Sequence, residues 1–211
     1  MFSSLLRAVP AVLFFATGAQ AHPHVFVDVR LSFEADAAGR ISAVEVTWSY
    51  DELFSLLILS DRAMDTDADM ALTEAEQADL IGFDLMNWPD WFNGALFIES
   101  EAGPVELGPP EALSIALEEG RLVTRHRRAA PPVESDRLVV KPYDPSFYAQ
   151  LRMAGAPDLP EGCASETIPP DDASVTLNMQ RLGDPTDETL FEEAMVGVYY
   201  ADTVVITCGA R

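Results

Sequence analysis

The sequence predicts an α+β fold in which a β-rich, antiparallel, sandwich-like domain carries an inserted helical hairpin. Apolar and polar residues alternate along residues 24–34 and again along 41–50, which is the period of strands with one buried face. Between residues 51 and 90 the apolar residues instead cluster as they do on helices. Alternating segments separated by turn residues then resume. We therefore expect packed antiparallel sheets, with the helices inserted after the first two strands.

The first two strands form a hairpin around a turn at residues 37–39. A helix is expected to begin after Asp51, because aspartate caps helix N-termini, and a second one spans about 73–87. The segment 158–172 is rich in proline and acidic residues and is predicted to be a loop, and a short helix is expected at 188–194. Later strands are expected at 96–98, 105–107, 113–117, 122–126, 138–140, 175–179 and 203–207.

The first 21 residues have the features of a secretory signal peptide. Arg7 supplies a positive charge, residues 9–16 are apolar, and Ala19-Gln20-Ala21 is a small-x-small cleavage site. The apolar run is shorter than the roughly 20 residues that cross a bilayer. We expect cleavage after Ala21, so that residues 22–211 form a single periplasmic domain that does not span the membrane. An uncleaved anchor is the alternative.

The formal net charge is −22, and removal of the single positive charge of Arg7 takes it to −23. Such a surface makes nucleic acid and anionic membranes poor partners and cations good ones. Solubility alone is the simpler explanation of the acidity. The hydrophobic content of 48% argues against a disordered chain.

Cleavage would leave His22 at the N-terminus, with His24 two residues later. A free α-amine and two imidazoles are ligands for Ni²⁺, Co²⁺, Cu²⁺ or Zn²⁺. Pro23 excludes a square-planar site that uses the amide of residue two, because proline has no N–H. Asp28 lies on the same strand face but roughly 13 Å from His24, too far to share the ion. The alternative is that the two histidines only cap the end of the sheet.

Residues 65–76 have the spacing of an EF-hand calcium loop. A calcium ion requires six to eight oxygens, and alternate loop positions closed by a long glutamate supply them. Met70 stands at position six, where the backbone turns with a positive φ and glycine is usual, so we expect weak binding near the millimolar end of the range. A solvated acidic turn without an ion is the alternative. The predicted ligands are Asp65, Asp67, Asp69, the carbonyl of Ala71, and Glu76.

The chain has two cysteines, Cys163 and Cys208. In an exported protein a disulfide between them is the default. The chain-entropy model assigns about 4 kcal/mol to closing so long a loop. Two free thiols and a thiol metal site are the alternatives.

The sequence shows no Ser/His/Asp or Cys/His constellation and no glycine loop for phosphate. A copper oxidase built on a histidine brace would have to recruit His126, which stands among three arginines. We expect His126 at the surface or at a sheet edge. The prediction is therefore that the protein is not an enzyme.

Several short runs stand in a fixed order along the mature chain, and two of them are each followed by a cysteine. The runs are 22–28, Thr47-Trp48, 51–55, the acidic loop 65–76, 143–148 and 201–204. In this order they resemble a bacterial periplasmic family of unknown function, often labelled the periplasmic component of an uncharacterised ABC-type transport system. The aromatic residue of the first run is shifted by one place to Phe26, and Met70 replaces the usual glycine.

That family is often encoded beside nickel/cobalt-type permeases, so the resemblance implies divalent-metal handling and an inner-membrane metal permease as partner. We accordingly predict a periplasmic accessory protein for transition-metal transport, with His22 and His24 as metal ligands and the acidic loop as a structural calcium site. The alternative is a calcium-dependent periplasmic interaction module with no transition-metal role.

Overall fold

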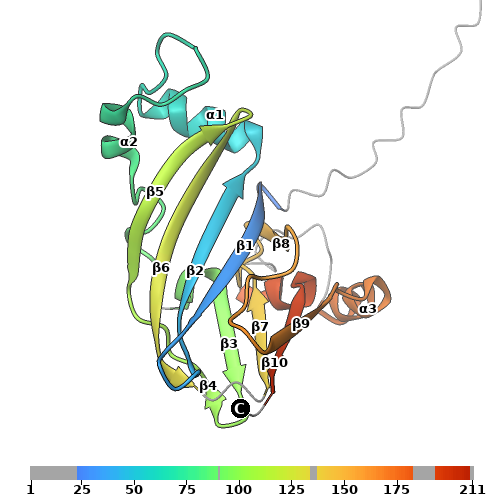
Figure 1. Cartoon of the computed structure of the whole chain (residues 1–211). Helices are drawn as coiled ribbons and strands as arrows, with labels where there is room; N and C mark the ends of the chain where they lie inside the picture. Colours follow the sequence, from blue (N-terminus) through green and yellow to red (C-terminus); the bar gives the residue numbers. More distant parts are fainter. Residues whose placement is uncertain (1–22, 90, 134–136, 183–192, 210–211) are drawn as a thin grey trace, which may run out of the picture.

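The structure is a computed structural model that describes residues 23–89, 91–133, 137–182 and 193–209. Two five-stranded sheets form its body (Figure 1). Sheet A has the order β5-β6-β2-β1-β8, and its pairs are antiparallel except for β1 with β8, which run parallel. Its strands are β1 (Val25–Ala35), β2 (Ile41–Tyr50), β5 (Pro110–Glu118), β6 (Arg121–Val133) and β8 (Ala149–Met153).

Sheet B is antiparallel throughout and has the order β4-β3-β7-β10-β9. The inner faces of the two sheets contribute to one hydrophobic core, in which Val29 and Val46 of sheet A join Val140 and Val204 of sheet B. The predicted β-rich α+β sandwich is therefore confirmed. The strands of sheet B are β3 (Leu96–Ser100), β4 (Gly103–Pro104), β7 (Leu138–Pro142), β9 (Cys163–Ile168) and β10 (Thr203–Cys208).

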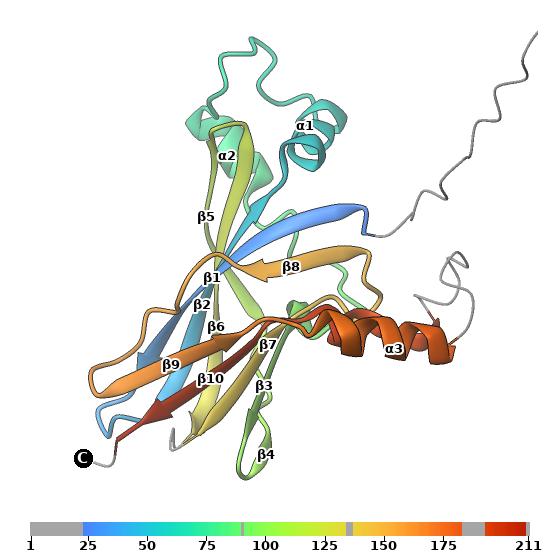
Figure 2. The same ribbon diagram turned by 90° about the vertical axis from the view of Figure 1, so that its right-hand side faces the viewer.

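Two helices, α1 (Glu52–Asp61) and α2 (Glu74–Leu80), follow β2 and lie at one end of sheet A (Figures 1 and 2). Asp51 caps α1 as predicted, since its carboxylate accepts a hydrogen bond from the Phe54 N–H. The second helix stops at Leu80, short of the predicted end, because Ile81 is extended and Gly82 takes a φ of 77°. Residues 81–89 and 91–92 have no regular structure, and the short 3₁₀ helix Asn93–Ala95 follows. Phe83, Asp84 and Trp88 of this segment contact Trp48 and Tyr50 on the inner face of sheet A.

The C-terminal third differs from the prediction in two places. The segment 175–179, predicted to be a strand, lies inside helix α3 (Asp172–Leu182). Val175 and Met179 stand four residues apart and pack together against Phe147, a spacing that also fits a strand face. The predicted loop 158–172 contains strand β9, whose polar residues form an edge held by pairing with β10.

Strand β8 was not among the predicted elements. The predicted helix 188–194 lies mostly outside the described residues, apart from its last two positions, which are helical. A second 3₁₀ helix, Val196–Tyr200, precedes β10.

Cys163 and Cys208 are joined by a disulfide, as predicted. They stand opposite each other in the β9–β10 pair, at a sequence separation of 45 residues. For a loop of this length the chain-entropy model gives about 4 kcal/mol of stabilisation. Within the described part of the chain, no helix combines the length and the apolar character needed to cross a membrane.

Candidate functional site

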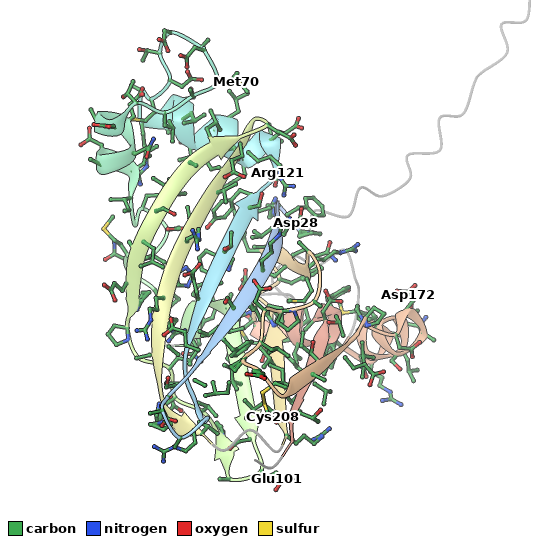
Figure 3. All side chains as sticks on the ribbon, in the orientation of Figure 1. Asp28, Met70, Glu101, Arg121, Asp172 and Cys208 are labelled. Carbon is green, nitrogen blue, oxygen red and sulfur yellow. A yellow bond between two sulfur atoms is a disulfide. The ribbon has the colours of Figure 1, made fainter. Side chains whose placement is uncertain are left out.

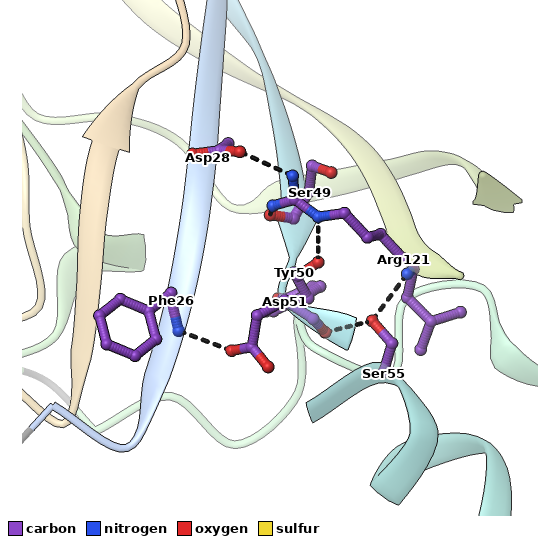
Figure 4. A network of polar contacts seen from close by, with 8 residues as sticks. Phe26, Asp28, Ser49, Tyr50, Asp51, Ser55 and Arg121 are labelled. Atoms are coloured by element: carbon purple, nitrogen blue, oxygen red, sulfur yellow. Dashed lines mark hydrogen bonds and ion pairs between the residues drawn. The ribbon is translucent and has the colours of Figure 1, made fainter. Parts of the chain in front are cut away.

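The helical hairpin is fixed to the end of sheet A by a polar network (Figure 4). The Asp51 carboxylate accepts hydrogen bonds from the Phe54 N–H in α1 and from the Phe26 N–H in β1, at 2.9 and 2.8 Å. The Ser55 hydroxyl donates to the Asp51 carbonyl and accepts from the Leu122 N–H, both within 2.8 Å. The start of α1, which follows β2 directly, is thereby tied to β1 and β6.

Arg121 completes this network. Its guanidinium donates to the Asp28 carboxylate and to the carbonyls of Ser49 and Tyr50, each at 2.7 Å. Asp28, a member of the N-terminal run that carries the family resemblance, therefore pairs with an arginine on the outer face of the sheet.

The loop between α1 and α2 brings three of the predicted calcium ligands together. One carboxylate oxygen from each of Asp65, Asp67 and Asp69 lies within 4.8 Å of the other two. Asp65 is partly exposed, and the other two are exposed. Asp65 Oδ1 accepts from the Asp69 N–H at 3.1 Å, and Asp69 Oδ1 accepts from the Ala71 N–H at 2.9 Å. These bonds curl the backbone around the carboxylates.

Met70 adopts a φ of 63°, the left-handed conformation that the sixth position of such a loop requires. Its terminal methyl lies over Gly120 in the turn between β5 and β6, 3.3 Å from where a Cβ on that glycine would stand. The Met70 side chain thus approaches the turn between β5 and β6. A glycine at position 70 would remove the backbone strain but would lose this approach. Met70 lies at the opposite end of the molecule from Cys208 (Figure 3).

The second half of the loop follows the predicted pattern. Leu72 is buried in the main core, and α2 begins at Glu74, so the last three loop positions are helical. Glu76 reaches back to the loop start, where its Oε1 accepts from the Asp65 N–H at 2.7 Å. Its Oε2 accepts from the Thr73 N–H and hydroxyl in a capping box. These bonds, those from Thr73 first, lower the pKa of Glu76.

Of the two N-terminal histidines, the structure describes only His24. His24 is exposed at the start of β1, where its N–H donates to the Tyr148 carbonyl at 2.9 Å and the two rings lie 5.0 Å apart. His22 lies outside the described residues. The predicted pairing of the two imidazoles therefore stays a prediction.

The expected position of His126 is wrong. The residue is 1% exposed and lies on the inner face of β6, a strand flanked by β5 and β2. The Trp48 ring packs edge-on against the imidazole at 4.7 Å, and neither ring nitrogen has a hydrogen-bond partner among the described residues. Burial, followed by the charge of Arg128, lowers the pKa of His126 to about 4.

The neighbouring arginines misled the prediction, because strand alternation sends them to both faces. Arg125 and Arg127 point outward and pair with glutamates on β2 and β1. Arg128 points inward and donates to the backbone carbonyls of Gly108, Asn93 and Leu107. Counting every second residue of β6 from Leu122 puts His126 on the inward face, and this pattern is the signal that could have found its position.

Sequence reasoning also missed Asp84, in the irregular segment after α2. Its Oδ2 accepts hydrogen bonds from the Tyr50 hydroxyl at 2.9 Å and the Thr124 hydroxyl at 2.6 Å. Its Oδ1 is buried without a hydrogen-bond partner among the described residues. Burial raises the pKa of Asp84 and, more strongly, that of Tyr50. No spacing in the sequence marks this residue, because it stands alone inside a segment predicted to be helical.

Residues 8–208 match a family described as a protein of unknown function (DUF1007). The chain belongs to this family. The match covers nearly the whole chain and includes the acidic loop, the inner face of β6 and both cysteines. No curated protein and no solved structure shows significant similarity to the chain.

Proposed function

We propose that this protein is a calcium-dependent interaction module of the bacterial periplasm, in which loop 65–76 binds Ca²⁺ and the adjoining helix α1 meets a partner. The observation that carries the proposal is the convergence of three carboxylate oxygens within 4.8 Å on a loop whose closing glutamate already reaches the first residue. A hard divalent cation would relieve the repulsion among these charges.

The donor set suits calcium better than a transition metal, because all of its ligands are oxygens. Three aspartates and the Ala71 carbonyl supply ligands from the loop. Glu76 supplies two more once its carboxylate leaves the capping box, at the cost of the two bonds from Thr73. With this cost and the positive φ of Met70, we expect a dissociation constant of roughly 10⁻⁴–10⁻³ M, the range of extracellular calcium modules.

The interaction surface is the outer face of α1. Leu53, Leu56 and Leu57 have exposed fractions of 67%, 63% and 52%, and they share one face of the helix at i, i+3 and i+4. The opposite face buries Ser55 and Leu59 against the sheet. A solvent-facing apolar stripe on a helix, next to a strongly acidic loop, fits a partner that is both apolar and basic. A protein of the inner membrane is the partner that we propose.

The location rests on the N-terminal segment and on the disulfide. The signal-peptide features of residues 1–21 predict export. A disulfide between β9 and β10 fits an oxidising compartment.

The first experiment is calorimetric titration of the mature protein with Ca²⁺ and with Mg²⁺, together with thermal unfolding at each concentration. Asp67→Ala is the informative variant, because no described residue hydrogen-bonds to the Asp67 carboxylate and the loop loses only a ligand. Asp79 is an exposed residue of α2, and Asp79→Ala is the control for the change in net charge. We expect Ca²⁺ binding in the wild type and the control and a loss of at least tenfold in Asp67→Ala. Equal affinity in both variants would sink the calcium site.

The partner surface is tested separately. We expect Leu53→Ser/Leu57→Ser to keep the calcium affinity, because both side chains point away from the protein. The same variant should lose calcium-dependent cosedimentation with bacterial inner membranes. Cosedimentation that persists in the variant would move the interaction to another surface.

Transition-metal handling is the second candidate function. It is favoured by the exposed position of His24, which immediately precedes β1 near the start of the hairpin. Native mass spectrometry of periplasmic protein tests it with Ni²⁺, Co²⁺, Cu²⁺ and Zn²⁺. An adduct that disappears in His22→Ala/His24→Ala would support it, and the intact mass also reports whether His22 is the N-terminus. The absence of any adduct at micromolar metal would count against it.

A further inference from the structure

A cavity of about 250 Å³ lies between the inner face of sheet A and the segment that follows α2. Its walls are almost wholly apolar, and aromatic rings come from β2, from α1, from the covering segment and from the turn before β8. The volume is somewhat below the roughly 300–1,000 Å³ of sites for drug-sized ligands, so it suits a smaller molecule. The aromatic residues are Trp48, Tyr50, Phe54, Trp88, Phe92 and Tyr148.

Asp84 gives this apolar cavity a negative charge. Its side chain is largely buried, and it forms no ion pair with any residue that the structure describes. Both hydrogen bonds to its carboxylate come from uncharged hydroxyls and reach the same oxygen. Arg128 is a buried cation on the inner face of β6, the face that also carries Thr124. Its guanidinium donates hydrogen bonds to backbone carbonyls and lies over the ring of Trp88.

A buried carboxylate without a countercharge is costly, and the cost falls when a cation enters the adjoining space. The aromatic walls favour the same kind of guest, because ring faces attract cations. Asp144 also lines the cavity and adds to the negative potential, although its oxygens are occupied by bonds from Ser146 and Ala149. The net charge of −22 draws cations toward the molecule from a distance.

We propose that this cavity binds a small organic ammonium ion with an apolar body, whose charge is balanced by Asp84 and whose body lies among the aromatic rings. An inorganic cation fits poorly, since the two carboxylates of an otherwise apolar wall, one of them already occupied by hydrogen bonds, cannot replace its hydration shell. A neutral apolar molecule would leave the Asp84 charge uncompensated. The site is independent of the acidic loop, which shares none of its residues.

The test compares three probes of one shape in the wild-type protein: 2-phenylethylamine, the neutral 2-phenylethanol and the anionic phenylacetate. Binding is followed by calorimetry and by the fluorescence of Trp48 and Trp88, which line the cavity. We expect saturable binding of the amine, at least tenfold tighter than that of the alcohol. Equal affinity for amine and alcohol overturns the proposal. So does the absence of saturable binding of 2-phenylethylamine up to about 10 mM.

Asp84→Asn locates the site, because the amide keeps the size of the side chain and its oxygen still accepts from the two hydroxyls. We expect the affinity of this variant for the amine to fall at least tenfold. Asp158 is exposed, and the control Asp158→Asn should retain wild-type affinity. Trp88→Phe is the second variant, and it should weaken amine binding several-fold even if Asp84→Asn does not fold. Unchanged binding in both variants places the ammonium ion elsewhere and overturns the assignment.

Discussion

The inserted segment between β2 and β3 holds carboxylates in two opposite environments. Asp65, Asp67 and Asp69 crowd together at an exposed tip, where water screens their repulsion and the cost of clustering is small. Asp84 stands alone under the sheet, where a single charge without a countercharge is costly. The contrast teaches that the density of charges says little about how strongly a site requires a partner. Burial decides it.

The largest expected effect concerns His126, a buried titratable group packed against Trp48 and Trp88. Its pKa is lowered from 6.5 to about 4 in the folded protein. Above pH 6.5 the ring is neutral in both states and costs nothing. As the pH falls from 6.5 toward 4, His126 becomes protonated in the unfolded chain but stays neutral in the folded protein. The free energy of unfolding therefore falls, by about 3 kcal/mol in total.

His126→Phe removes this proton and keeps a flat ring between the two tryptophans. We expect the variant to match or exceed the wild type at pH 7.5 and to be more stable by about 2–3 kcal/mol near pH 4.5. Urea unfolding at both pH values measures the difference, and the carboxylates and remaining histidines, common to both proteins, cancel. Parallel stability curves for the two proteins would contradict the burial of a neutral imidazole.

The next effect compares one hydroxyl–carboxylate bond in each environment. Thr124 donates to Asp84 in the interior, and Thr73 donates to Glu76 at the exposed loop. Thr124→Val should lower the free energy of unfolding by about 2 kcal/mol, because a buried carboxylate loses a donor. Thr73→Ala should cost about 1 kcal/mol, mainly through the lost helix cap.

Chemical unfolding of both variants at pH 7.5 gives the comparison. Adding Asp84→Asn to Thr124→Val should recover part of the loss, because the uncompensated charge is gone. Equal costs for the two threonines would mean that burial contributes little to the Asp84 site.

The smallest expected effect concerns Met70 in the exposed acidic loop. Met70→Gly removes the strain of a side chain at a φ of 63°, at the loss of a contact with Gly120 from a side chain that is 56% exposed. If the loop binds calcium as proposed, the affinity should rise by about fivefold, equivalent to roughly 1 kcal/mol. Calorimetric titration measures it. A higher melting temperature with unchanged calcium affinity would show that the positive φ is fixed without the ion.

The two environments also differ in how far the sequence predicts them. The acidic loop follows from local spacing, since Asp65 to Glu76 carry their own geometry and the cap at Thr73 is a neighbour in sequence. The first hairpin, β1 and β2, is read equally well from its alternation. In these regions a short stretch of chain determines its own structure.

The interior site depends on residues far apart in sequence. Asp84 meets Tyr50 and Thr124 only because α2 stops early and the chain turns back over sheet A. His126 is placed by its register opposite Val46, and β9 by its pairing and disulfide with β10. None of these partners is visible in a local window, so tertiary pairing overrides the local pattern.

The parallel pairing of β1 with β8 has a consequence for how the domain assembles. The outer edge of the first strand is closed by residues 149–153, more than half the chain away, and Ser32 bridges further to Asp158. A ribosome or translocon releases the N-terminal end first, so the edge from Val25 to Val29 waits with unpaired backbone groups until the late strand arrives. Contacts of such sequence separation slow folding, and chains truncated before residue 149 should be strongly aggregation-prone.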